Sequence, residues 1–277
     1  MIALKTLRTT AAAGLLLLGS VAGFSTDAYA ASANSVAKID WDSLSISFIG
    51  DIDLGDGPAI DQLDTLSDTT LANAFANGVN PLVSAGPNTT FDWDNGSFAQ
   101  AETGNDHYNG NSTAETPNST PGSNFKSESQ VFSDRQGWIV DVNSKALRSG
   151  EFTAIGEGFV LVTVGYSLFA EASDGGVLLP GDTASASARV SALLRNLTSG
   201  ASAVTSSDAG ITVGFGENLA DDGLIGVLLY FHNGDRGHLD ISALSSASTS
   251  SSPVPLPAAG WLLGGALMMM AARRRRV

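Results

Sequence analysis

Alternation of apolar and polar residues at a period of two is the dominant pattern along the chain, and it predicts β-strands. In residues 159–171 an apolar side chain at every second position falls on one face, and residues 183–195 repeat the pattern with alanine, valine and leucine. Turn signals at 174–176 and 180–182 lie between them, which predicts a hairpin with a long loop. Residues 39–49 alternate in the same way and predict a first strand.

The last third of the chain predicts further strands at 211–215, 224–232 and 238–244. Because residues 224–231 are apolar on both faces, we expect them at the centre of a sheet. The sequence Asn233-Gly234-Asp235 predicts the turn to the last strand. Other short strands are expected at 97–103, 130–133, 138–142 and 151–155.

Three segments interrupt this pattern. Residues 61–76 have leucines and a phenylalanine at helical spacing and predict a short helix. Residues 104–123 are almost wholly polar and predict a long exposed loop, and residues 245–252 read SSASTSSS, which predicts a flexible linker. With about ten strands, the fold class expected for residues 31–244 is all-β, an antiparallel β-sandwich that is jelly-roll-like.

The first 30 residues have the layout of a secretory signal peptide. Lys5 and Arg8 form a basic region, residues 11–19 form a short apolar core, and Ala28 and Ala30 are small residues at the positions that a signal peptidase reads. We therefore expect export and cleavage after Ala30. An uncleaved anchor helix is the alternative.

The last 25 residues predict a membrane segment. Residues 258–272 carry no charge, and a span needs at least about 17 apolar residues. Counted from Leu256, the run only just reaches that length, and three glycines weaken it. The arginines that follow mark the cytoplasmic side of a transmembrane helix and act as the topology stop: Arg273, Arg274, Arg275 and Arg276.

The tail also resembles a known sorting signal. A proline motif precedes the apolar stretch and the arginine cluster, in the order typical of the VPLPA-CTERM domain, a variant of the bacterial PEP-CTERM domain; it comprises Val254, Pro255, Leu256, Pro257 and Ala258. The resemblance covers about a tenth of the chain. It implies a Gram-negative source and processing at the motif by an exosortase, a membrane-embedded, cysteine-dependent enzyme. A plain single-pass anchor is the alternative.

The resemblance further implies an inner-membrane-anchored intermediate that is later released to the cell surface or to an exopolysaccharide matrix. The expected partners are therefore a signal peptidase, an exosortase-type enzyme, the membrane and an exopolysaccharide. The motif implies nothing about the fold between the two signals.

Composition narrows the class of the exported domain. The two ends carry six of the 14 basic residues and one of the 28 acidic residues, so the body between them has a net charge of about −19. Such a charge excludes a nucleic-acid binder, which needs a basic face. The chain has no cysteine, so neither disulfides nor thiolate chemistry is available.

Candidate metal ligands are few. Asp51, Asp53 and Asp56 lie close together and offer oxygen ligands for Ca²⁺, but their spacing departs from the EF-hand template, and a solvated acidic turn is the favoured interpretation. Residues 92–96 and the turn predicted at 221–223 are read in the same way. We expect no cofactor other than this candidate calcium ion.

The sequence contains no motif that identifies catalytic residues. His232 and His238, with Asp235, flank one predicted turn and are weak metal candidates, and His107 stands apart. No nucleophile elbow, phosphate loop or zinc-protease motif is present. The sequence therefore favours a non-enzymatic surface or matrix protein.

Two alternatives remain open. The first is a carbohydrate-binding or adhesive module, with sugar-stacking candidates in the aromatic residues Trp41, Trp93, Trp138, Tyr108 and Tyr166. The second is a secreted hydrolase, whose carboxylate pair only three-dimensional spacing would define.

Overall fold

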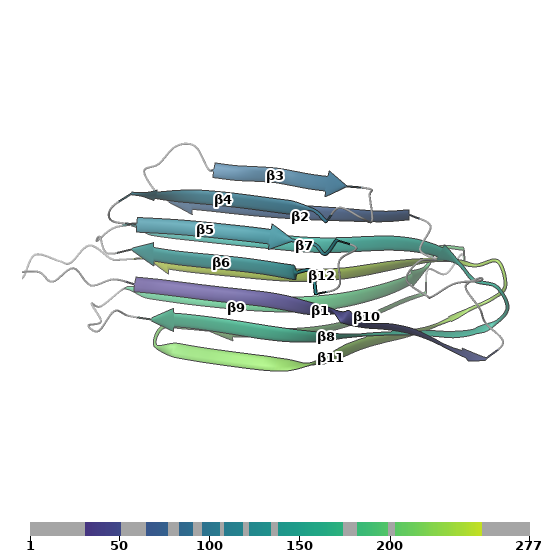
Figure 1. Cartoon of the computed structure of the whole chain (residues 1–277). Coiled ribbons are helices and arrows are strands. Elements are labelled where there is room, and N and C mark those ends of the chain that lie inside the picture. Colours follow the sequence, from purple (N-terminus) through teal and green to yellow (C-terminus); the bar gives the residue numbers. More distant parts are fainter. Residues whose placement is uncertain are drawn as a thin grey trace, which may run out of the picture.

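Two antiparallel β-sheets packed face to face make up the part of the protein that the structure describes (Figure 1). The structure, a computed structural model, describes residues 31–50, 65–76, 83–90, 96–105, 108–118, 122–133, 138–173, 182–198 and 203–250. The all-β antiparallel sandwich predicted from the alternation is thereby confirmed. Within these ranges there is no helix, and the strands are longer than expected.

Each sheet has six strands. The first sheet consists, in spatial order, of β11 (Glu217–Phe231), β8 (Gly158–Ser173), β1 (Ala31–Gly50), β6 (Phe125–Ser133), β5 (Tyr108–Glu115) and β4 (Phe98–Asn105). The second consists of β10 (Val204–Val213), β9 (Thr183–Asn196), β12 (Arg236–Ser250), β7 (Ile139–Thr153), β2 (Thr65–Ala76) and β3 (Val83–Thr90).

We call the end of the sandwich that holds Ala31 and Ser250 the base, and the opposite end, with the turn at His232–Asp235, the tip. The core differs between them. Near the tip it consists mainly of large side chains, including Ile39, Phe125, Phe152, Val160, Val162, Ile225, Phe231 and Ile241. Near the base it is mainly alanine, as at Ala33, Ala72, Ala74, Ala99, Ala101, Ala170, Ala172, Ala184, Ala186 and Ala247.

The predicted strands at 159–171 and 183–195 are confirmed as parts of β8 and β9, but the hairpin between them is not. β8 pairs with β1 and β11, whereas β9 pairs with β10 and β12 in the other sheet. The connection therefore crosses between the sheets. Alternation identifies a strand but does not identify its partner.

The predicted helix at 61–76 is wrong for its described part, because residues 65–76 form β2. β2 pairs along its length with β7, from Thr65 opposite Glu151 to Ala76 opposite Val140. Ala72, Ala74 and Ala76 point into the core, where the alanine-rich packing accepts only small side chains. Tertiary packing overrides the helix propensity of alanine and leucine here.

The predicted loop at 104–123 is also wrong in part, since Tyr108–Glu115 is strand β5 between β4 and β6. Its inward positions are Tyr108, Gly110, Ser112 and Ala114, most of them too small or too polar to register as hydrophobic alternation. A Cβ at Gly110 would press on Val140 and Val142 of β7, so glycine is needed for the two sheets to approach.

The linker predicted at 245–252 is wrong for residues 245–250, which complete strand β12. Ser245, Ala247 and Thr249 are buried, so the serine-rich string alternates between core and solvent. Residues 251 and 252 lie outside the described residues. Domain packing therefore extends to Ser250, six residues beyond the boundary expected from composition.

Two expectations for β11 are corrected as well. Residues 221–223, expected in a turn, lie inside the strand and pair with Leu168–Tyr166 of β8. Residues 224–231, expected at the centre of a sheet, belong to an edge strand, and among the described strands its only hydrogen-bonded neighbour is β8. The apolar outer positions of this segment are therefore exposed to solvent.

Candidate functional site

The two ends of the described domain lie together at the base. Ala31 opens β1 opposite Ser133, and Ser250 closes β12 between Ile139 and Thr183. β1 and β12 face each other across the sandwich, where the Ser35 hydroxyl donates to the carbonyl of Ser246 at 2.9 Å. Each of these two residues is four positions from its end of the domain, so both ends leave from the same side (Figure 1).

The predicted processing residues themselves lie outside the described residues. These are the signal-cleavage residues Ala28 and Ala30, the sorting motif Val254–Ala258 and the arginines Arg273–Arg276. Among the residues that the structure places, there is no helix with the length and apolar character needed to cross a membrane. The geometry nevertheless locates the points from which both terminal segments depart.

Strand β12 connects the tail to the domain interior. It is paired on one side with β7, from Arg236 to Ser250, and on the other with β9, from Gly237 to Ser250. It thus lies inside its sheet and not at an edge. Tension applied beyond Ser250 would act along a strand that is hydrogen-bonded on both sides.

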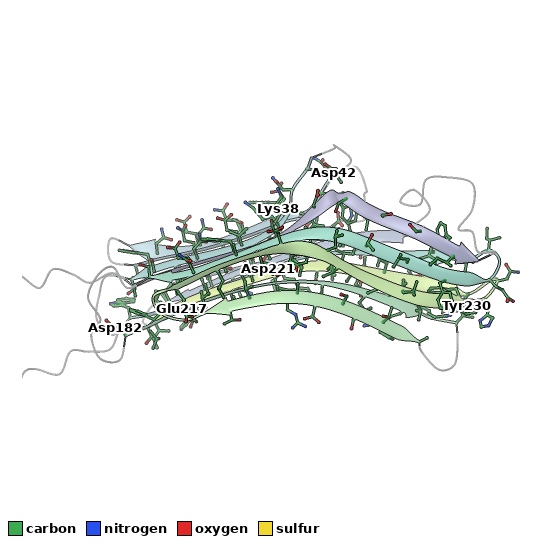
Figure 2. The ribbon with its side chains drawn as sticks, turned by 90° about the horizontal axis from the view of Figure 1, so that it is seen from below. Lys38, Asp42, Asp182, Glu217, Asp221 and Tyr230 are labelled. Carbon is green, nitrogen blue, oxygen red and sulfur yellow. The ribbon has the colours of Figure 1, made fainter. Side chains whose placement is uncertain are left out.

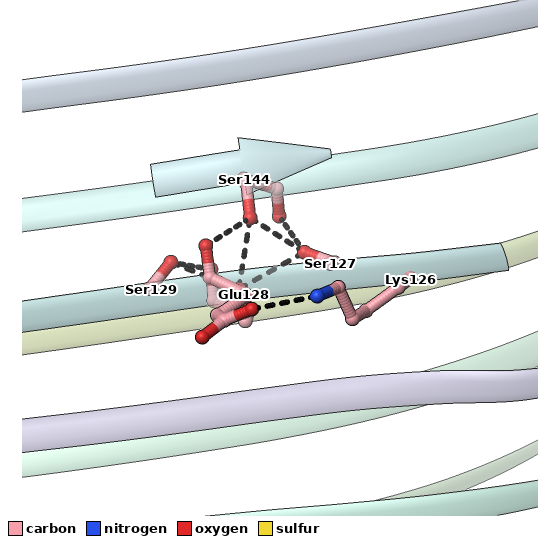
Figure 3. A network of polar contacts seen from close by, with 6 residues as sticks. Lys126, Ser127, Glu128, Ser129 and Ser144 are labelled. Atoms are coloured by element: carbon pink, nitrogen blue, oxygen red, sulfur yellow. Dashed lines mark hydrogen bonds and ion pairs between the residues drawn. The ribbon is translucent and has the colours of Figure 1, made fainter. Parts of the chain in front are cut away.

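A cluster of four buried serines ties the sheets together near the middle of the sandwich (Figure 3). Ser127 and Ser129 come from β6, Ser144 from β7 and Ser245 from β12. The Ser245 hydroxyl lies 2.9 Å from the Ser127 hydroxyl, 2.8 Å from that of Ser129 and 2.9 Å from that of Ser144. Ser127 and Ser144 are 2.7 Å apart.

Each serine hydroxyl of the cluster other than that of Ser245 also has a backbone carbonyl as acceptor, as at Glu128 for Ser144 and at Ser144 for Ser127. Buried hydroxyls need such partners, because an unpaired one is costly in a medium of low polarity. The hydrogen bonds of these hydroxyls are to other serines and to carbonyl groups, with no base to activate a nucleophile. The cluster is a structural link between the sheets.

The ion pair between Arg148 and Asp68 is buried between the two sheets. Nε of Arg148 lies 3.0 Å from Oδ1 of Asp68, and both side chains are almost inaccessible to solvent. The guanidinium carbon is 4.8 Å from the centre of the Trp41 ring, which itself packs on Phe125. Burial raises the pKa of Asp68 to about 6, although the charge of Arg148 and a hydrogen bond from Thr116 act in the opposite direction.

At the tip, apolar side chains project from the outer face of the first sheet. Phe159 of β8 and Tyr230 of β11 are paired neighbours with ring centres 5.1 Å apart, and they are 41 % and 38 % exposed. Leu224 and Leu228 extend the surface along β11, at 73 % and 45 % exposure. Figure 2 shows Tyr230 at one end of this strand and Glu217 at the other.

This surface was missed by sequence reasoning, although its signal was present. The sequence of this strand is apolar on both faces, a pattern that predicts the centre of a sheet. The aromatic residues named as sugar-stacking candidates lie elsewhere: Tyr108 is buried and stacks on Trp138 at 4.5 Å, and the hydroxyl of Tyr166 donates to Asp221. Trp93 lies outside the described residues.

The outer face of the second sheet carries a cluster of ionisable side chains near the tip. Nε2 of His238 lies 2.9 Å from Oδ1 of Asp240, and Glu151 lies between His238 and Arg236. The Ser149 hydroxyl donates to the same oxygen of Asp240. Because Ser149 bonds to the carboxylate and not to the imidazole, these groups do not form an activated serine.

The histidine–metal hypothesis finds no assembled site. Nδ1 of His232 lies 3.6 Å from Oδ2 of Asp235 in the turn, whereas His238 contacts Glu151 and Asp240 on the outer face of the second sheet. Asp235 instead closes the turn, and the backbone N–H of His232, followed by the side-chain amide of Asn196, lowers the pKa of Asp235.

Over the described ranges, no group of three or more histidine, aspartate or glutamate side chains converges to hold a metal ion. The calcium candidates Asp51, Asp53 and Asp56, as well as His107, lie outside those ranges. No protein-family model, no curated protein and no solved structure matches this chain.

Proposed function

We propose that this chain is an exported, non-enzymatic structural protein of the cell surface or extracellular matrix, held transiently at the inner membrane by its C-terminal segment. The observation that carries the proposal is the common departure of both terminal segments from the base. A chain anchored there directs the long axis of the sandwich away from the membrane, with the tip outermost. The sorting motif then lies between the folded domain and the membrane.

The path of β12 supports the same function. Because Ser250 is still paired on both sides, only three residues separate the sheet from the motif that begins at Val254. We infer that residues 258–272 form the membrane helix and that Arg273–Arg276 hold its end in the cytoplasm. The motif is then presented close to the membrane surface, which suits a membrane-embedded processing enzyme.

A carbohydrate-binding module is the alternative function, and its support is weaker. Sugar rings stack on flat aromatic faces, but the exposed rings of Phe159 and Tyr230 cross at 73°. A secreted hydrolase has less support still, since Ser149 lacks a histidine partner.

Fractionation of the producing bacterium tests the proposal. The unmodified chain should be recovered from the medium or matrix, whereas a Pro255→Ala/Pro257→Ala chain should remain in the membrane fraction. Pro253→Ala, just outside the motif, is the matched control and should behave like the unmodified chain. Equal release of the motif variant and the control would contradict processing at the motif.

A further inference from the structure

The outer edge of β11 pairs with no other strand that the structure describes, and it lacks the features by which proteins protect edge strands. Natural edges carry lysine, proline, a bulge or only a short strand, because unpaired backbone groups otherwise recruit another strand. β11 has 15 residues, contains no lysine, arginine or proline, and pairs with β8 without a register shift from Glu217 to Phe231. Seen from below, it runs along the near side of the molecule from Glu217 to Tyr230 (Figure 2).

The strand has an acidic half and an apolar half. Glu217, Asp221 and Asp222 lie in its first six residues, and residues 224–231 carry no charge. Parallel pairing of two such strands would set the acidic side chains beside each other, which is unfavourable. Antiparallel pairing about a two-fold axis within the apolar half sets the two apolar halves against each other and places the two acidic segments at opposite ends of the pairing.

We propose that two copies of this chain associate by antiparallel pairing of their β11 strands, with Val227 on the two-fold axis. On the outer face this register sets Leu224 opposite Tyr230 of the second copy, and Gly226 opposite Leu228. On the inner face it sets Ile225 opposite Leu229 and the small Gly223 opposite Phe231. Every apolar side chain of the segment thereby meets an apolar or glycine position.

The same register also provides charge complementarity. Asp222 lies opposite His232 of the second copy, and the imidazole of His232 is 65 % exposed beside Tyr230. An imidazole donates a hydrogen bond to a carboxylate and adds an ion pair when it is protonated. A self-complementary patch of this kind is what a two-fold interface requires. The first sheet would continue across the axis as twelve strands.

Disulfide cross-linking tests the pairing and its register in the full-length chain, which has no cysteine of its own. Leu224→Cys and Tyr230→Cys chains, each with a different tag, should form a mixed disulfide when they are combined and oxidised. Neither variant should link to itself, because the register separates like positions by about 20 Å, far beyond the disulfide limit of about 7 Å.

A charge placed on the edge provides the second measurement. Leu228→Lys should reduce the mixed disulfide at least about tenfold, since the lysine is then set into an apolar pairing. Val204→Lys, at a half-exposed position on the edge strand β10 of the other sheet, should leave the yield unchanged. Absence of the mixed disulfide, self-linking of either single variant, or equal effects of the two lysines would overturn the proposal.

Discussion

Ser245 and Ser246 are adjacent serines in one serine-rich string, yet the structure gives them opposite environments. Ser245 is buried and its hydroxyl contacts three others, at 2.9 Å, 2.8 Å and 2.9 Å. Ser246 is exposed, and its hydroxyl contacts only that of Ser187, at 3.0 Å. Replacing each serine with alanine therefore tests whether this string is a strand or a linker.

The expected cost of Ser245→Ala follows from these contacts. The change removes the hydroxyl at the centre of the cluster, but Ser127, Ser129 and Ser144 keep their backbone acceptors at 2.8 Å, 3.2 Å and 3.0 Å. Because the remaining donors stay paired, we expect a loss of about 1–3 kcal/mol in the free energy of unfolding. Ser246→Ala should change it by less than about 0.5 kcal/mol.

Thermal unfolding followed by circular dichroism measures the difference. For a domain of this size, 1 kcal/mol corresponds to about 2–4 °C in Tm, so Ser245→Ala should lower Tm by several degrees relative to Ser246→Ala. Ser245→Leu should lower it further, since the added atoms have no space between closely packed sheets. Identical Tm values for all three variants and the unmodified chain would refute the placement of residues 245–250 in β12.

Three further predictions concern the remaining core and the turn at the tip. The pKa of Asp68 is about 6 in the folded protein against 3.8 as its ordinary value, so the folded state favours the protonated carboxyl. The free energy of unfolding should therefore fall by about 3 kcal/mol as the pH rises from below 3.8 to above 6. Urea titrations should show this decrease in the unmodified chain and not in Asp68→Asn. Gly237→Ala should lower Tm, because its Cβ would overlap the ring of Phe152, whereas Gly210→Ala meets only ordinary contacts and serves as the control. Asp235→Asn should lower the free energy of unfolding at pH 7 by about 1–3 kcal/mol and by less at pH 3, because below 3.8, the ordinary pKa of this carboxyl, the unfolded chain takes up the proton and the stabilisation by ionised Asp235 declines.

The large alternating strands were predictable from the sequence. In β8, apolar residues at every second position fit the period of a strand and no other, and this pattern predicts the burial of one face. β9 was recognised as readily although its inward residues are mostly alanine, because outward serines and arginines completed the contrast.

Strands lined by small polar residues could not be recognised in this way. The inward positions of β5 include glycine and serine, and those of the end of β12 include Ser245 and Thr249. Hydropathy does not separate such residues from those of a loop. The hydroxyls of Ser112 and Ser245 are buried with hydrogen-bond partners in the opposite sheet, which only the folded arrangement brings within reach.

The exposed edge escaped prediction for a different reason. An apolar strand is consistent with the centre of a sheet or with an edge that meets another molecule, and the local pattern is the same in both cases. The distinction lies in the order of the described strands, in which β11 pairs with β8 and with no other. The surface proposed here for self-association is therefore a property of topology as much as of sequence.

We propose that the tail after Ser250 is a processed sorting signal. Mass spectrometry of the C-terminus of the protein recovered from culture, with and without the exosortase-type enzyme, tests it most directly. With the enzyme, we expect chains that end within Val254–Ala258, and without it, chains that retain Arg273–Arg276. An intact arginine cluster on the mature surface protein would contradict processing and leave a simple membrane anchor.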